Sequence, residues 1–224
     1  KAYQKEFLLH LSNIMNIPWA ISIDAADSGY TPIVADSELM ALRFGLFDDS
    51  FMHEHHEIKQ GDGYNERCWQ EIGKGTRWQK GVCGGEISYY TSNDQRNFLN
   101  PEGMYGWTWE DASAKYHLTF IIANDATGGI YGTVDRFREA GMAVGYSFEV
   151  MNCRTNGEET RLAVTNTGIA PIYRDAYFAI GDAQSSTSLC CVMPNDTVEI
   201  SIPRGYNEGD SLIIVSPHIL PTQT

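Results

Sequence analysis

Several features that would mark a familiar class of protein are missing from this sequence. No apolar run approaches the roughly 20 residues that span a bilayer, so we expect no membrane span. The five cysteines contain no CxxC pair and two of them are adjacent, which predicts neither a structural zinc nor a disulfide framework. The motifs GxSxG and GxxxxGK are absent, which removes the usual signatures of esterases and nucleotide-binding proteins. The sequence predicts no cofactor.

Positive charge is also scarce. The 224 residues carry 16 Lys and Arg against 29 Asp and Glu, which gives a net charge of −13. Such a surface repels phosphates, so we expect no nucleic-acid partner and favour a neutral or cationic ligand. A hydrophobic content of 42% with 12% aromatic residues is typical of an ordinary globular protein with a core.

The first part of the chain, residues 1–140, alternates apolar runs with stretches of helical spacing. The apolar runs are predicted strands at 17–23, 43–47, 78–86 and 117–125. The helical stretches lie at the N-terminus, 35–44, 108–116 and 133–142. Asp36 or Ser37 is the expected N-cap of one helix, and Thr108 that of another. Near-continuous apolar strands between helices indicate a parallel sheet that is buried on both faces.

The second part, residues 141–224, has a different pattern. Short stretches of alternating apolar and polar residues are divided by Gly, Asn, Asp and Pro, and helical spacing is absent. Six such stretches, including 187–193, predict an antiparallel β-sandwich. The expected fold class is therefore α/β plus all-β, with one domain of each kind.

Four β/α units do not close a barrel, which needs eight, and alone they would leave two open sheet edges. The chain also enters its first helix without a cap or an initiator methionine. We therefore expect a missing N-terminal barrel half, either upstream or on another chain, with a small open sheet as the alternative.

Several segments together resemble a known group of proteins. They are RFGLFDDSF, GVCGGEISY, YHLTFIIAND, REAGMAVGYSFEV, TNTGIAPIYRDAYFAIG and SPHILPTQT. The chain from about residue 40 onward is similar to an uncharacterised bacterial family, a domain of unknown function whose members resemble glycoside hydrolases. The resemblance implies a TIM-type (β/α)8 barrel followed by a C-terminal β-sandwich, and a secreted, periplasmic or cell-surface location. By this resemblance, strands five to eight of the barrel are residues 17–23, 43–47, 80–86 and 117–123.

Polar residues follow several predicted strands, where parallel α/β folds hold their sites. Glu86 ends one strand after two glycines, which would let a ligand approach the backbone closely. Its place at the end of strand seven resembles that of the nucleophile in retaining barrel glycosidases, so Glu86 is the expected catalytic nucleophile or base. The alternative is a glutamate that bridges two loops through hydrogen bonds.

Asp48 and Asp49 end the preceding strand, and adjacent strand residues point to opposite faces, so only one of them can face the barrel mouth. We assign Asp48 to the catalytic set and Asp49 to substrate binding. The alternative is that one acid caps the next segment while the other is solvated.

The segment from His53 to Glu57 suggests a metal site, but the zinc motif HExxH fails because its last position is Glu57. A barrel mouth or a solvated loop is favoured over a metal site, with His53 as a substrate contact. Asn124, at the end of the last predicted strand, is expected to bind substrate too.

Aromatic residues crowd the segments around Glu86. Trp78, Tyr89 and Trp107 are predicted to stack on sugar rings, with core packing as the alternative. The predicted function is hydrolysis of a polysaccharide or glycan. The alternative is a non-catalytic carbohydrate-binding or structural surface protein on a degenerate barrel, which would lack a second carboxyl group facing Glu86.

Overall fold

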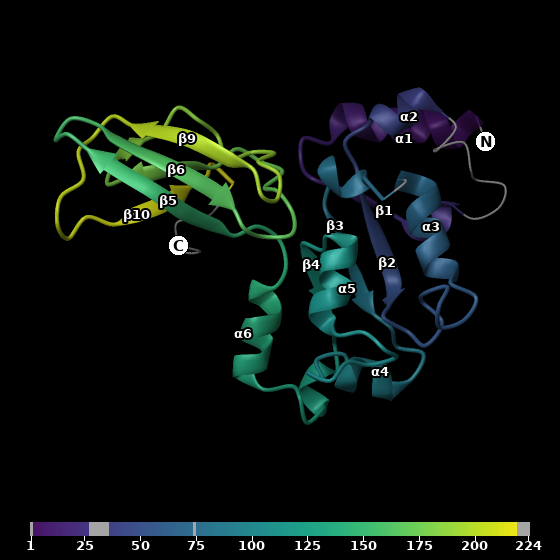
Figure 1. Ribbon diagram of the computed structural model, residues 1–224. Coiled ribbons are helices and arrows are strands. Elements are labelled where there is room, and N and C mark those ends of the chain that lie inside the picture. Colours follow the sequence, from purple (N-terminus) through teal and green to yellow (C-terminus); the bar gives the residue numbers. More distant parts are fainter. Residues whose placement is uncertain (1, 27–35, 74, 219–224) are drawn as a thin grey trace. The chain divides into compact units, whose positions relative to one another are not determined.

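The computed structural model describes residues 2–26, 36–73 and 75–218. The chain divides into two compact units, residues 1–144 and 145–224. Each unit has a hydrophobic core of its own. Figure 1 shows helices and a sheet in the first unit, and strands and loops in the second.

The first unit contains alternating helices and strands. In chain order its described elements are α1 Ala2–Ile14, β1 Ala20–Ser22, the 3-10 helix η1 Ile23–Ala26, α2 Ser37–Ala41, β2 Gly45–Phe51, α3 Tyr64–Gly73, η2 Arg77–Gln79, β3 Cys83–Ile87, α4 Ser92–Asn97, α5 Trp109–Tyr116, β4 Phe120–Ile122, η3 Ala126–Gly128 and α6 Val134–Met142.

The four strands of this unit form one parallel sheet in the order β1-β2-β3-β4. This confirms the predicted parallel sheet. A register shift after Asp48 marks a bulge in β2, beyond which Phe51 pairs with Ile87. Because the strands are parallel, their carboxyl ends meet at one edge of the sheet, the edge that holds sites in α/β folds.

The core of the first unit lies on one face of this sheet. Leu46 and Cys83 are fully buried there, in the core that includes Trp69 of α3 and Tyr116 of α5. Figure 1 shows α3 and α5 beside the strands. The opposite face carries the exposed side chains of Asp49 and, 45% exposed, Ile122. The prediction that both faces are buried is therefore wrong for the described residues, because the core forms on one side only.

Phe47 and Phe120 lie on this second face, which we call the open face. Their rings are 6.3 Å apart and nearly parallel. Between them runs Gly84 of β3, where a Cβ atom would lie 2.4 Å from the carbonyl oxygen of Phe120. At Gly85 a Cβ atom would lie 1.9 Å from the carbonyl oxygen of Asp48. Any larger residue at these two positions would collide with the backbone of a neighbouring strand. The structure therefore explains the two glycines by strand packing, whereas the sequence suggested that they allow the close approach of a ligand.

The predicted caps are present. The side chain of Thr108 accepts a hydrogen bond from the Asp111 amide at 3.1 Å and begins α5. Asp36 accepts from the Leu39 amide at 3.2 Å and begins α2. Helices α3 and α4 were not predicted. Helix α4 is short and polar, whereas α3 places Cys68, Trp69 and Ile72 at helical spacing, a signal that the sequence interpretation missed.

The second unit contains β5 Phe148–Thr155, β6 Thr160–Asn166, β7 Tyr177–Ile180, β8 Ala183–Gln184, β9 Thr197–Ile202 and β10 Leu212–Val215. These form two antiparallel sheets, in the orders β5-β6-β9 and β10-β7-β8. Leu162 of β6 and Ile200 of β9 are buried in one core with Phe178 of β7. Five of the six predicted antiparallel strands are confirmed.

One predicted strand of the second unit, 187–193, is not a strand. Cys190 makes a single bridge to Ile172, and Cys191 has a φ angle of 62°, outside the range of a β-strand. Leu189 and Val192 are nevertheless buried. The apolar residues of this segment therefore fill the core from a turn, which periodicity alone does not distinguish from a strand.

Candidate functional site

Three carboxylates lie at the carboxyl end of the parallel sheet. Asp48 of β2 points into the core and Asp49, the residue after it, is exposed on the open face. Glu86 of β3 pairs with Ile122 and lies on the same face. Asp24 lies in η1, directly after β1. We call Asp24, Asp49 and Glu86 the acidic row, because they come from three neighbouring strands or strand ends.

Glu86 is half-buried and accepts a hydrogen bond from Nδ2 of Asn124 at 3.1 Å. Asn124 follows β4, so the structure brings together two residues that the sequence assigned to the site. The amide holds Oε1 of the carboxylate and leaves Oε2 without a hydrogen bond among the described residues. Glu86 therefore has one oxygen that is oriented and one that is available to a ligand.

Asp49 has an unusual electrostatic environment. Partial burial raises the pKa of its carboxyl group, and the nearby charges of Asp24 and Asp48 raise it further. Asp24 is itself held by the hydroxyl of Tyr64, which donates to Oδ1 of Asp24 at 3.1 Å. A carboxyl group whose pKa is raised is the kind of group that general acid catalysis uses.

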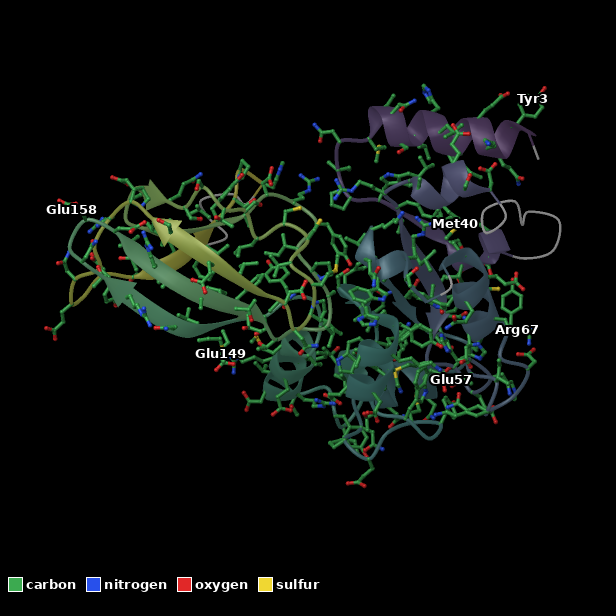
Figure 2. The ribbon with its side chains drawn as sticks, turned by 45° about the horizontal axis from the view of Figure 1, so that its top comes forward. Tyr3, Met40, Glu57, Arg67, Glu149 and Glu158 are labelled. Carbon is green, nitrogen blue, oxygen red and sulfur yellow. The ribbon has the colours of Figure 1, made fainter. Side chains whose placement is uncertain are left out.

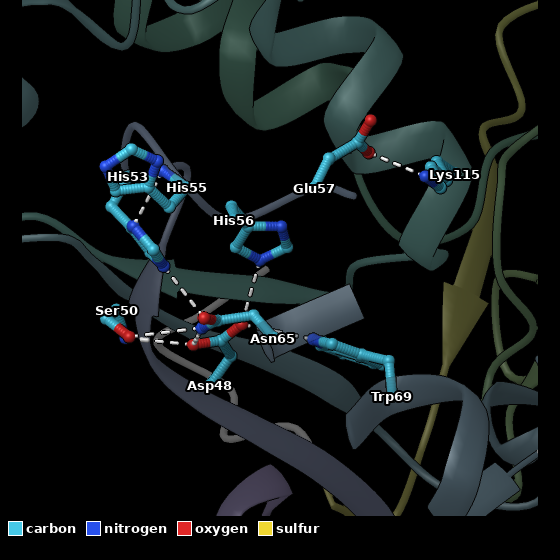
Figure 3. A network of polar contacts seen from close by, with 9 residues as sticks. All are labelled: Asp48, Ser50, His53, His55, His56, Glu57, Asn65, Trp69 and Lys115. Atoms are coloured by element: carbon cyan, nitrogen blue, oxygen red, sulfur yellow. Dashed lines mark hydrogen bonds and ion pairs between the residues drawn. The ribbon is translucent and has the colours of Figure 1, made fainter. Parts of the chain in front are cut away.

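Asp48 lies on the opposite face of the sheet, at the centre of a buried polar network (Figure 3). Its Oδ1 accepts from the Ser50 amide and from Nδ2 of Asn65, each at 2.9 Å. Its Oδ2 accepts from Nε2 of His56 at 3.0 Å and from Nε1 of Trp69 at 3.1 Å. The carboxylate is therefore fully satisfied by donors from β2, the following loop and α3.

This network decides the charge of Asp48. Complete burial alone would raise the pKa of its carboxyl group, but the hydrogen bond from His56 and the charge of that ring outweigh it. Together with the Ser50 amide and Trp69 they hold the pKa of Asp48 below its usual range. Asp48 is an ionised core residue, so the catalytic role assigned to it from the sequence is not one that its position allows. Of the two adjacent acids, Asp49 is the one that shares a face with Glu86.

His53 is held at the edge of the same network. Its Nε2 donates to Oδ1 of Asn65 at 2.8 Å, and its Nδ1 accepts from the His55 amide at 3.0 Å. Both ring nitrogens are therefore occupied, and the ring faces Tyr90 edge-on at 5.5 Å. His53 can offer a ligand its ring surface, but neither a metal ligand nor a free base.

The segment from His53 to Glu57 divides between surface and core. Glu54 and His55 are exposed, whereas His56 is fully buried against Asp48 and Glu57 is 2% exposed. Glu57 forms an ion pair with Lys115 of α5 at 2.6 Å (Figure 3). The segment is therefore not a solvated loop throughout. Within residues 2–26, 36–73 and 75–218, no group of three His, Cys, Asp or Glu side chains is arranged to hold a metal ion.

A cavity of about 470 Å³ lies beyond the carboxyl ends of β2 and β3. His53 contributes to its wall. Its other lining side chains include three tyrosines and three acids: Tyr64, Tyr90, Tyr105, Glu54, Asp62 and Asp94. We call this cavity the tyrosine pocket. It adjoins the acidic row, because Tyr64 both lines the pocket and hydrogen-bonds to Asp24.

The aromatic residues assigned to sugar binding have three different positions. Trp107 is 5% exposed and packs on Phe51 in the core. Trp78 stacks on His117 at 3.7 Å, before β3 and β4 and thus at the opposite end of the sheet from Glu86. Tyr89, 60% exposed, lies two residues after β3 and is the only one of the three at the same end of the sheet as Glu86 and outside the core. Core packing, the alternative reading, holds for Trp107, while Trp78 is too far along the strands to contact a ligand at Glu86.

The sequence interpretation missed three residues of this region. Asp24 directly follows a predicted strand, and the rule applied to the other strands would have identified it. Tyr64 begins α3, a helix that was not predicted. Asp94 is 1% exposed and accepts hydrogen bonds from three hydroxyl groups, of which the Tyr105 hydroxyl lies at 2.7 Å. No local pattern in the sequence signals that convergence.

Comparison with models of known protein families gave no match, and searches of curated proteins and of solved structures gave none either. Among the helices of the described residues, none combines the length and the apolar character that crossing a bilayer requires.

Proposed function

We propose that this protein is carbohydrate-active, a glycoside hydrolase that acts on a polysaccharide or glycan, and that the acidic row is its catalytic centre. One observation carries the proposal. Asp49 and Glu86 lie on neighbouring strands and point to the same open face, and the pKa of Asp49 is raised. Glycosidases need two carboxyl groups at the scissile bond, one that gives a proton and one that acts as nucleophile or base.

The proposed reaction uses the two groups in turn. Asp49 and Glu86 come from neighbouring strands, whose backbones are about 4.8 Å apart, and a retaining mechanism requires their carboxyl groups to approach to about 5 Å across the scissile bond. Glu86 attacks the anomeric carbon while Asp49 gives its proton to the departing glycosidic oxygen. Water then cleaves the glycosyl–Glu86 bond and returns a proton to Asp49. Asn124 orients Glu86 through its amide, and Asp24 keeps the pKa of Asp49 high.

We also propose that the parallel sheet is half of a (β/α)8 barrel and that the second unit is a β-sandwich. The strands run in one direction with helices between them, and Phe47 and Phe120 lie outside the core on the open face, as the lining of a barrel interior would. The other barrel strands would cover this face and close both edges of the sheet. Such a protein would act outside the cell, in the periplasm or at the cell surface.

The test is turnover of a glycan panel, measured as the release of reducing sugar. We expect Glu86→Gln and Asp49→Asn to lower the rate by about 100- to 10,000-fold, the usual contribution of such groups. The matched control is Glu158→Gln, an exposed glutamate of the second unit (Figure 2), which should retain the activity. Unchanged turnover in Glu86→Gln would remove this residue from the reaction and overturn the proposed mechanism.

The second candidate function is carbohydrate binding without catalysis. Tyr89 and Tyr90, 60% and 70% exposed, present two neighbouring rings at the end of β3, which favours binding of a sugar ring by stacking. Calorimetric binding of a glycan that the chain never cleaves would support this candidate and contradict hydrolysis.

A further inference from the structure

The tyrosine pocket combines apolar rings with negative charge. Its lining includes the carboxylates of Glu54, Asp62 and Asp94, and neither lysine nor arginine is among the described residues that line it. We propose that this pocket binds a sugar residue with a protonated amino group, so that the substrate is an amino-sugar polysaccharide of the glucosamine type. This inference rests on the proposed function, because it treats the pocket as a subsite next to the acidic row.

The size and surface of the pocket suit one or two sugar rings. A cavity of about 470 Å³ is within the range of small-ligand sites. The ring of Tyr90 is 70% exposed, and Tyr64 and Tyr105 are half-buried, so their faces are partly available for stacking on the apolar side of a sugar. Tyr105 is fixed by its hydrogen bond to Asp94. The Tyr105 side of the pocket is therefore fixed before a ligand arrives, which reduces the entropy lost on binding.

The three carboxylates of the pocket differ in how far hydrogen bonds hold them in place. Asp94 is saturated by hydroxyl donors, and Asp62 accepts from the Tyr64 amide at 3.1 Å at the start of α3. Glu54 is exposed and forms neither a hydrogen bond nor an ion pair with any described residue. Glu54 is thus the group that can move to meet an ammonium ion, while Asp62 and Asp94 supply a fixed negative field.

Two histidines, His53 and His55, also line the pocket, but they face three carboxylates and so do not cancel this field. Nδ1 of His53 accepts a hydrogen bond from a backbone amide, so that nitrogen carries no proton and the ring is neutral in this arrangement. A protonated amine gains from such an environment, a neutral sugar gains only the stacking, and an anionic sugar is repelled. The charge balance therefore selects among sugars that fit equally well.

The experiment is isothermal titration of the Glu86→Gln chain, in which bound oligosaccharide is not cleaved. The probes are four-residue oligomers of glucosamine, of N-acetylglucosamine, of glucose and of galacturonate, at low salt and near pH 6. We expect the glucosamine oligomer to bind about tenfold more tightly than the N-acetylated one, with a preference that shrinks at high salt. Adding Glu54→Gln should weaken its binding by about two- to fivefold, whereas adding Glu158→Gln should leave it unchanged.

The outcomes separate this inference from the proposed function. Equal or tighter binding of the neutral or anionic oligomers would overturn the amino-sugar inference and leave glycoside hydrolysis standing. A preference for glucosamine that survives Glu54→Gln and high salt would show that charge does not select the ligand, which also overturns the inference. If none of the oligomers binds, the pocket is not a sugar subsite, and turnover of the glycan panel decides the proposed function by itself.

Discussion

Replacing Asp48 by asparagine should lower the free energy of unfolding of the first unit and leave the residues of the open face unchanged. Each oxygen of the carboxylate accepts two hydrogen bonds, from the Ser50 amide and Asn65 on one side and from His56 and Trp69 on the other. An asparagine retains one oxygen, so two buried donors meet an NH₂ group that cannot accept from them.

The magnitude follows from those two losses. Hydrogen bonds to a charged group contribute about 1.5–3 kcal/mol each, so losing two should lower the free energy of unfolding by about 3–6 kcal/mol. Breaking a buried charged network by removing one partner typically lowers it by about 3–5 kcal/mol, in agreement with that sum. Since a domain is stable by only about 5–15 kcal/mol, the variant should be close to the limit of folding.

Urea unfolding followed by tryptophan fluorescence measures this change. All five tryptophans lie in residues 1–144, so the signal reports the first unit. The matched control is Asp49→Asn, the exposed neighbour, which should change the unfolding free energy by no more than about 0.5 kcal/mol. A loss below about 1 kcal/mol in Asp48→Asn, with an unchanged slope of unfolding against urea, would show that the network does not stabilise the unit as reasoned here.

Three further predictions concern the same unit. Because the folded pKa of Asp48 is depressed, its stabilisation is complete above the pKa of an unfolded aspartate, about 3.9, and is lost as the pH falls through the lower folded value. The urea midpoint should therefore drop in acid, and drop less in Asp48→Asn; an equal drop would contradict this. Gly85→Ala, whose Cβ would lie 1.9 Å from the Asp48 carbonyl oxygen, should lower the unfolding free energy by about 1–3 kcal/mol, unlike Gly141→Ala, whose Cβ meets nothing within 4 Å. Thr108→Ala should lower it by about 1 kcal/mol through the lost N-cap and Thr108→Ser should not, both measured by thermal unfolding.

Much of the fold can be predicted from short-range patterns. The apolar runs are long enough to identify the four parallel strands. The helix starts are identified by Thr108 and Asp36, residue types that are preferred as N-caps because their side-chain oxygen accepts a hydrogen bond from an amide in the first turn. Short-range patterns fail in the segment 187–193. Leu189 and Val192 are as apolar as strand residues, but the chain turns at Cys191, which has a positive φ angle. Backbone angles of that kind are set by tertiary packing, and periodicity carries no information about them.

The candidate site shows a similar division. The sequence identifies the acids at the strand ends, because polar residues directly after buried strands stand out, and Glu86 and Asn124 are indeed joined by a hydrogen bond. It also establishes that Asp48 and Asp49 point to opposite faces, since strand side chains alternate.

Which of the two adjacent acids faces solvent was decided by the tertiary structure alone. Helices α3 and α5 cover one side of the sheet, and His56, Asn65 and Trp69 converge there on Asp48 from positions 8, 17 and 21 residues further along the chain. Alternation along a strand is a local property of the backbone and is written in the sequence. The side on which the core forms depends on how distant segments bury their apolar surface together, and that is a property of the folded chain.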